Sequence, residues 1–198
     1  MPDPAQPTAN QAAFDFLLTR HSNPAKLYKG PVPTRDALLA ILTAATRVPD
    51  HGKLEPWRLV VIEKPAMARL ADLAEVRARE LGGDAEKIAK GRGQYDLGQL
   101  AVAVIASPKA SDKIPASEQM LSAGALCFAI VLSASAAGWS ANWLSGWPSQ
   151  DADFAARAFG CTGNETVAGI IHIGTLGTAP LPDRPRPDLA RLITWAPA

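Results

Sequence analysis

The longest apolar stretch of the 198-residue chain predicts a helix at its centre. Between Leu121 and Gly138 the sequence carries no charged residue. Apolar side chains recur there at helical steps of three and four residues, at Met120, Ala123, Leu126, Cys127, Ile130, Val131 and Ala134. The other faces carry Ala, Gly and Ser, so we expect a helix that is buried on all sides and stops at Gly138. Few residues remain to surround such a helix, and a second copy of the chain is the expected cover.

The same stretch is close to the length of a membrane span, which needs roughly 20 mostly apolar residues. Three serines dilute it, at Ser122, Ser133 and Ser135, and its many Ala and Gly residues are much less hydrophobic than Leu. No cluster of Lys and Arg flanks it, as one usually flanks an oriented span. We therefore expect the core helix of a soluble protein.

Shorter patterns on both sides of this stretch predict further helices and three buried strands. Apolar periodicity and capping residues predict helices over residues 11–19 after a cap at Asn10 or Thr8, from Thr34 to Ala45, from Pro65 to Gly82, after Asp84, and from a cap at Ser149 or Asp151 to Gly160. Runs of β-branched and other apolar residues predict strands over residues 58–63, 100–107 and 167–174. We expect residues 91–95 to form a loop.

Composition limits the class of protein more than it suggests a function. The chain is long enough for one domain with a real core, and its net charge of +1 gives no electrostatic case for nucleic acid or an anionic membrane. Cys127 and Cys161 are far apart and are expected to be reduced thiols. Residues 1–9 lack the basic start and apolar core of a signal peptide. We expect a disordered tail over residues 1–9, a single domain over residues 10–198, and a cytoplasmic location.

Two polar segments are candidates for chemistry. Arg20-His21-Ser22 ends the first helix, where such donors can bind an anion, although a solvated helix end is the commoner meaning of this pattern. The segment from Arg47 to Trp57 precedes a strand and is dense in charged side chains. Its Asp50-His51 pair could be a catalytic pair or a metal site, but adjacent side chains seldom meet productively and the other histidines lack ligand spacing. We therefore predict no metal site.

Several common motifs are absent from the sequence. The glycines at positions 169, 174 and 177 lack the spacing of a dinucleotide-binding fingerprint, and no P-loop or Gly-x-Ser-x-Gly elbow is found. The tail from Asp183 to Trp195 is first basic and then apolar. It could be an arm that wraps a partner subunit, or a tail that packs on its own domain.

Taken in order, the motifs resemble the nitroreductase family of flavin enzymes, and within it the small YdjA-like branch. The resemblance covers nearly the whole chain, from about Phe14 to Trp195. Five pieces carry it: Arg20-His21-Ser22; Arg47-x-Pro-Asp-His51 with Pro56-Trp57; Ser122-Ala123-Gly124; Asn142-Trp143-Leu144-Ser145-Gly146; and Ala158-Phe159-Gly160-Cys161.

The resemblance implies an α+β fold, with a mixed central sheet flanked by helices, in an intertwined homodimer. Two FMN molecules would lie at the dimer interface, against the long central helix. Residues matching the family's FMN-binding positions are Arg20, His21, Ser22, Trp143, Leu144 and Ser145, with Arg47 and His51 reaching FMN from the partner subunit. Residues matching positions linked to NADH or NADPH are Lys90, Ser133, Ala134, Ser135, Ala136, Ala137 and Gly138.

The chain departs from the branch at Leu144, where the pattern has Arg. Arg184 or Arg186 could replace this cation, because other branches use basic residues of the C-terminal arm on the FMN phosphate.

The activity implied is the reduction of a small aromatic acceptor, a nitroaromatic or a quinone, in a ping-pong cycle with NAD(P)H. The chemistry would belong to flavin N5, so no side chain is assigned as nucleophile or general acid. The alternatives are another FMN reaction on this fold, such as dehalogenation or oxidative ring chemistry, and a non-catalytic flavin-binding dimer.

Overall fold

The computed structural model describes residues 8–177 and 185–196, which belong to two compact units. One unit is Ser22–Gly177, and the other takes the described parts of Met1–His21 and Thr178–Ala198. Most of the predicted disordered tail and Arg184 lie outside the described residues. The prediction of one domain behind a disordered tail therefore stays a prediction.

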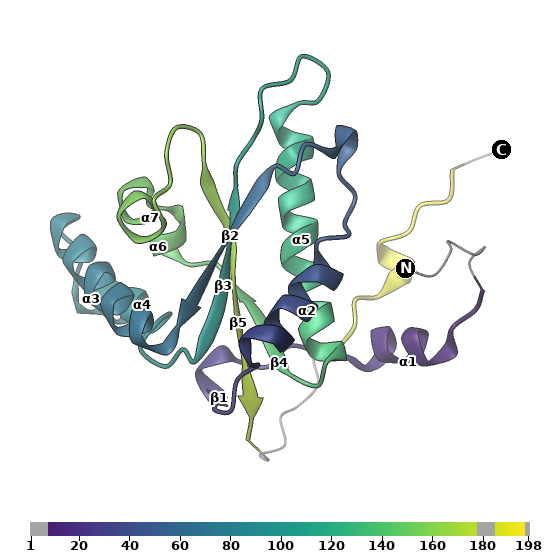
Figure 1. Cartoon of the computed structure of the whole chain (residues 1–198), viewed down its shortest axis with the longest axis horizontal. Coiled ribbons are helices and arrows are strands. Elements are labelled where there is room, and N and C mark those ends of the chain that lie inside the picture. Colours follow the sequence, from purple (N-terminus) through teal and green to yellow (C-terminus); the bar gives the residue numbers. More distant parts are fainter. Residues whose placement is uncertain (1–7, 178–184, 197–198) are drawn as a thin grey trace. The chain divides into compact units, whose positions relative to one another are not determined.

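The larger unit is built on a five-stranded sheet whose pairings are all antiparallel in the described part of the chain (Figure 1). β2 (Trp57–Glu63), β3 (Leu100–Ala106) and β5 (Thr166–Leu176) lie side by side in that order. β5 also pairs with β1 (Tyr28–Lys29) and with β4 (Ser140–Leu144). The longest strand, β5, thus contacts three of the other four.

Helices cover both faces of this sheet, as Figure 1 shows. One face is covered by α2 (Arg35–Ala45) and α5 (Ala116–Ala136). The other is covered by α3 (Lys64–Glu80), α4 (Ala85–Arg92), α6 (Trp147–Gln150) and α7 (Ala152–Phe159).

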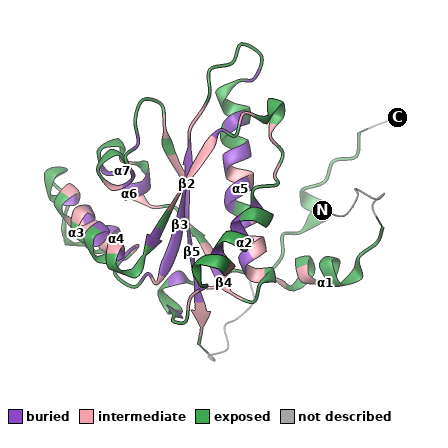
Figure 2. Cartoon of the chain, viewed as in Figure 1, coloured by how far each residue is buried: buried purple, intermediate pink, exposed green. Residues whose placement is uncertain are grey.

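The middle strand β3 explains why two helical layers are needed. All seven of its residues are buried, and Figure 2 shows the strand in purple, the colour of buried residues. Val102 and Val104 belong to the core under α5, whereas Ala103 and Ile105 belong to the core under α3 and α7. Because side chains alternate along a strand, a continuous apolar run must be covered on both faces. The predicted α+β class and helix-flanked sheet are confirmed, whereas the sheet that was expected to be mixed is antiparallel in every described pairing.

The predicted helix ends are confirmed where the sequence supplies a capping residue. The side chains of Thr34, Asp84 and Asp151 each accept a hydrogen bond from a backbone N–H in the first turn of the following helix. Gly160 ends α7 with a left-handed backbone, at φ 65°, and Gly138 follows α5 with φ 85°.

One prediction about local structure is wrong in part, and one strand was missed. A loop was expected over residues 91–95, but α4 continues to Arg92 with Gly91 buried in it, and only residues 93–95 of that range form turns after the helix. A Cβ at Gly91 would lie 2.6 Å from the indole of Trp147, so this glycine serves close packing and not a turn. The strand β4 was not predicted at all.

The central helix α5 is not buried on all sides within one chain. Leu126, Cys127 and Ile130 are fully buried against the sheet, whereas Leu121 is 74% exposed and Phe128 47%. Its length and composition would also permit a membrane span, and 44% of its most apolar window is buried inside the chain. The helix therefore has one face in the core and a second apolar face that the larger unit leaves uncovered (Figure 2).

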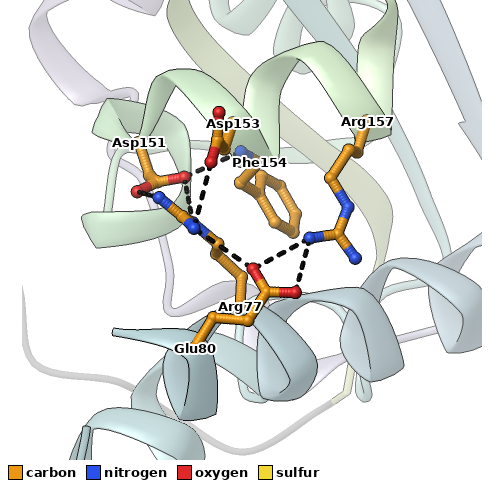
Figure 3. Close-up of polar contacts among 6 residues, drawn as sticks. All are labelled: Arg77, Glu80, Asp151, Asp153, Phe154 and Arg157. Carbon is orange, nitrogen blue, oxygen red and sulfur yellow. Dashed lines mark hydrogen bonds and ion pairs between the residues drawn. The ribbon is translucent and has the colours of Figure 1, made fainter. Parts of the chain in front are cut away.

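Ion pairs join α3 to the segment that carries α6 and α7 (Figure 3). Arg77 of α3 donates to both carboxylate oxygens of Asp151, at 2.9 and 3.1 Å, and also contacts Glu80 and Asp153. Glu80 in turn accepts from Arg157 at 2.9 Å. The paired guanidinium lowers the pKa of the Asp151 carboxyl against the opposing effect of burial, and keeps this helix cap charged.

The smaller unit has little core of its own. Its helix α1 (Gln11–Thr19) is capped by Asn10, whose side chain accepts a hydrogen bond from the backbone N–H of Ala13, and has no buried residue. Phe14 is 58% exposed and Trp195, near the end of the arm, is 85% exposed. The apolar side chains of this unit are therefore exposed and available to pack against another surface.

Candidate functional site

The loop between α2 and β2 has an unusual backbone at the predicted site residues. Gly52, Lys53 and Glu55 have φ values of 72°, 52° and 47°, in the left-handed region that is disfavoured for side-chain-bearing residues. The Asp50 carboxylate stabilises this bend, because it accepts hydrogen bonds from the backbone N–H groups of Leu54, at 3.2 Å, and Glu55, at 2.8 Å. The sequence therefore uses Asp50 to shape the loop, which argues against its being the partner of the adjacent His51.

The partner of His51 is Glu118, in the first turn of α5. His51 Nδ1 lies 2.9 Å from Glu118 Oε2. One turn further along the helix, the Ser122 hydroxyl donates to the carbonyl of Pro49, at the start of the same loop. The beginning of α5 thus holds the loop at two points.

A pocket of about 350 Å³ opens beside this pair. His51, Asp50 and Glu118 supply its polar wall, and Leu121 and Ala125 of α5 supply an apolar wall. Such a mixture of apolar surface and a few polar groups is typical of sites that bind small molecules.

The second predicted group, Trp143-Leu144-Ser145, lies at the end of β4 and just beyond it. Trp143 pairs with Ile171 of β5, and its indole crosses over Gly169 of the same strand. A Cβ at Gly169 would lie 2.0 Å from the indole Nε1. The missing side chain makes room for the ring, and the register of β5 shifts at this point, between Gly169 and Val167.

Both groups meet the first half of α5. The far edge of the Trp143 ring would lie 3.9 Å from a Cβ at Gly124, while Leu121 and Ala125 line the pocket beside His51. With 3.6 residues per turn, the positions of Leu121 and Gly124 differ by about one sixth of a turn around the helix axis. The two groups of predicted FMN residues therefore contact neighbouring sides of one short helix segment.

The structure does not gather all predicted residues in this place. Residues 133–138 form the last turn and end of α5, the far end from Glu118. Lys90 lies on α4, across the sheet from α5, where it pairs with Glu86 at 2.6 Å. Within one chain these candidate NAD(P)H residues lie on opposite faces of the sheet.

The remaining candidates belong to the smaller unit or to the point in the sequence where the larger unit begins. Arg20 and His21 end the N-terminal part of the smaller unit, and Ser22 begins the larger one. Arg186 is exposed in the C-terminal part of the smaller unit, and Arg184 lies outside the described residues.

The thiols and the buried histidine offer no alternative reaction centre. Burial raises the pKa of the Cys127 thiol to about 12 and also raises the pKa of Cys161. Both thiols therefore stay protonated and weakly nucleophilic near neutral pH. Burial lowers the pKa of His172 to about 4, so this residue of β5 is neutral. Over residues 8–177 and 185–196, no three His, Cys, Asp or Glu side chains lie close enough to hold a metal ion.

Sequence reasoning missed two residues of this site. Glu118 belongs to neither candidate segment, and nothing in the local sequence indicates that it meets a histidine 67 residues away. Gly169 was considered only as part of a dinucleotide motif. A glycine inside a β-branched run is itself a signal of close approach, and could have indicated the Trp143 contact.

Comparisons with known proteins agree on one family. The nitroreductase family model matches residues 17–175. A protein of Haemophilus influenzae that carries the name NAD(P)H nitroreductase is 34% identical over 82% of this chain and 88% of its own length. The similarly named YdjA of Escherichia coli is 32% identical over 82% and 87%.

Solved structures share the fold at lower identity. A nitroreductase-like family protein from Bacillus cereus is 20% identical, with a TM-score of 0.74 over 97% of this chain and 99% of its own. An FMN- and NADPH-dependent nitroreductase, NfnB, from a sphigopyxis strain is 19% identical, with a TM-score of 0.70 over 92% and 98%.

Proposed function

This chain belongs to the nitroreductase family, and on that premise we propose that it is an NAD(P)H-dependent flavin oxidoreductase that reduces nitroaromatic or quinone acceptors. The cofactor is FMN, which accepts and donates hydride at N5 when bound. Electrons from NAD(P)H would enter in one half of a ping-pong cycle, and the acceptor would take them in the other.

One observation carries this proposal: His51 and Trp143, which match separate FMN-binding positions, both lie beside the first half of α5, the helix whose exposed apolar face would pack against a second copy. A flavin needs a flat slot, and the Trp143 indole, laid across Gly169, offers a flat apolar surface beside the helix. The residues therefore fit a flavin ring.

The cofactor's phosphate needs cations, and the chain can supply them. Arg47 is exposed after α2 and makes no ion pair with a described residue. Arg20, His21 and Ser22 would contribute further donors. The branch has Arg at the position where this chain has Leu144. We infer that Arg186 of the C-terminal arm supplies this missing cation, because the residue is exposed.

The active form would be a homodimer with FMN at its interface. α5 presents an uncovered apolar face that includes Leu121 and Phe128, and the arm exposes Leu189, Leu192 and Trp195. Apolar surface of this kind on one chain is typical of an interface. In such a dimer, Arg47 and His51 of one copy would reach the FMN that the other copy holds through Trp143, Leu144 and Ser145.

NAD(P)H would be recognised near residues 133–138 and Lys90. These lie on opposite faces of the sheet in one chain, so a shared contact would require residues of two copies.

The experiment that tests the proposal is the visible spectrum of the purified protein, with and without NAD(P)H in the absence of oxygen. We expect a bound flavin that bleaches on addition of the reductant and recovers when a quinone is added. A flavin that does not bleach would mean a carrier, or an enzyme with another reductant. A colourless protein that fails to take up FMN would refute the proposal.

A further inference from the structure

We propose that Glu118 is a positioning residue that fixes the imidazole of His51, so that His51 can pass a proton to the oxygen-bearing end of the electron acceptor. The inference rests on the proposed function, and it adds to the flavin a proton donor built from this chain's own side chains.

The contact with Glu118 determines which ring nitrogen of His51 is free. A carboxylate can only accept, so Nδ1, which lies 2.9 Å from Glu118 Oε2, must carry the proton of this hydrogen bond. No described residue bonds Nε2. The nitrogen that remains available to a ligand is therefore Nε2 of a ring whose residue lines the 350 Å³ pocket.

Among the described charged neighbours of His51, Glu118 is the one whose carboxylate accepts a hydrogen bond from the ring. Both carboxylate oxygens of Asp50 already accept hydrogen bonds from the backbone of the loop. Lys53, on the other side of His51 in the chain, is exposed and makes no ion pair within the described part of the protein. Glu118 lies at the start of a long helix, where a negative charge is favoured.

The backbone around His51 is held firmly enough for a defined ring position. The Ser122 hydroxyl binds the carbonyl of Pro49 just before it, and Gly52 just after it is packed against Ile114. A Cβ at Gly52 would lie 2.5 Å from Ile114 Cδ1, and its φ of 72° also favours glycine. A side chain that is 63% exposed on such a loop still needs a fixed partner, and Glu118 provides it.

The proton balance of quinone reduction shows why a donor is needed. A quinone that takes up a hydride, which is two electrons and one proton, becomes a hydroquinone monoanion. This anion needs a second proton, which His51 would deliver from Nε2 while its Nδ1–H stays bonded to Glu118. The exposed ring then recovers its proton from water. A general acid placed in this way contributes about 100-fold or more to a rate.

The test compares two acceptors with the FMN-loaded enzyme at saturating NAD(P)H. 1,4-Benzoquinone needs hydride and a proton, whereas two ferricyanide ions take one electron each and no proton. We expect Glu118→Ala to lower the ratio of quinone turnover to ferricyanide turnover by about ten-fold, and His51→Gln to lower quinone turnover by about 100-fold. Asp112→Asn, which removes an exposed carboxylate from the connection before α5, should leave the ratio unchanged. An unchanged ratio in Glu118→Ala would overturn the proton-donor role.

A second readout does not depend on turnover. The chain has three histidines, so long-range proton–nitrogen spectra of the imidazoles can be assigned with His51→Gln and His21→Gln. At alkaline pH we expect the neutral His51 ring of the purified protein, with or without bound flavin, to carry its proton on Nδ1, and Glu118→Ala to shift the proton to Nε2. The same tautomer in both proteins would refute the positioning role.

The two readouts separate this inference from the proposed function. Wild-type protein without reducible flavin would refute the function itself, and the tautomer measurement would still decide whether Glu118 positions His51. Normal flavin reduction together with an unchanged turnover ratio and tautomer would refute only the inference.

Discussion

Replacing Gly169 by Ala is the sharpest test of the Trp143 arrangement. The added Cβ would lie 2.0 Å from the indole Nε1 and 2.6 Å from Cδ1, in a position where no real contact is possible. Ordinary contacts between heavy atoms begin at about 3.5 Å, so the ring must withdraw by about 1.5 Å. The strand cannot yield as easily, because β5 is held by its pairing with both β3 and β4.

The cost should appear in cofactor affinity more than in folding. Overpacking inside a core usually destabilises a protein by about 1–3 kcal/mol, but Trp143 is 39% exposed and can move toward solvent. We therefore expect the free energy of unfolding of the apoprotein to fall by less than about 1 kcal/mol. The displaced ring would no longer shape the flavin slot, and we expect FMN to bind about ten-fold more weakly, which corresponds to about 1.4 kcal/mol.

Titration of the apoprotein with FMN, followed by quenching of flavin fluorescence, measures this effect. Gly177→Ala is the matched control, because a Cβ there meets nothing within 4 Å. If the clash with the indole is the cause, Trp143→Leu combined with Gly169→Ala should bind FMN no more weakly than Trp143→Leu alone. Unchanged affinity in Gly169→Ala, or additive losses in the double variant, would refute the reasoning.

Three further predictions concern stability and the phosphate site. Burial lowers the pKa of His172 to about 4, so the unfolded chain takes up a proton before the folded protein does as the pH falls below about 6.5. Between pH 7 and pH 5 this difference should lower the free energy of unfolding, measured in urea, by about 2 kcal/mol. This decrease should be absent in His172→Gln and should remain in His21→Gln. Asp151→Ala removes both the α7 cap and the Arg77 contact and should lower the free energy of unfolding by about 2 kcal/mol, whereas Asp153→Ala, at a 67% exposed side chain, should change it by less than about 0.5 kcal/mol. Arg186→Ala should weaken FMN binding by about ten-fold in the same fluorescence titration if the arm supplies the missing cation, and an unchanged affinity would exclude that role.

Local signals predicted most elements of the larger unit. Capping residues such as Thr34 and Asp151 accept a hydrogen bond from the first turn of their own helix. The uninterrupted apolar run of β3 indicates that the strand is buried. β4 was missed because it has only five residues, and two of them, Ala141 and Asn142, have low strand propensity. Its position is fixed by pairing with β5, which no local pattern reports.

The candidate site was predicted only as far as the resemblance reached. The resemblance indicated His51 and Trp143, but not the residues that hold them. The contact between His51 and Glu118 joins a loop to a helix 67 residues further along the chain, and the contact between Trp143 and Gly169 joins two strands. Contacts between residues so distant in sequence come from the tertiary fold, and propensities or spacing do not encode them.

The central place of β5 also constrains how the chain can fold. β5 is the last of the described strands along the chain, yet it joins β3 to β1 and β4. Before residue 176 has been synthesised, β3 has one open edge and β4 has no partner in the sheet among the described strands. Contacts between segments so far apart in sequence form slowly, and open strand edges favour aggregation. Nascent chains that stall before β5 are therefore expected to need protection by chaperones, and removal of this one strand should abolish the fold.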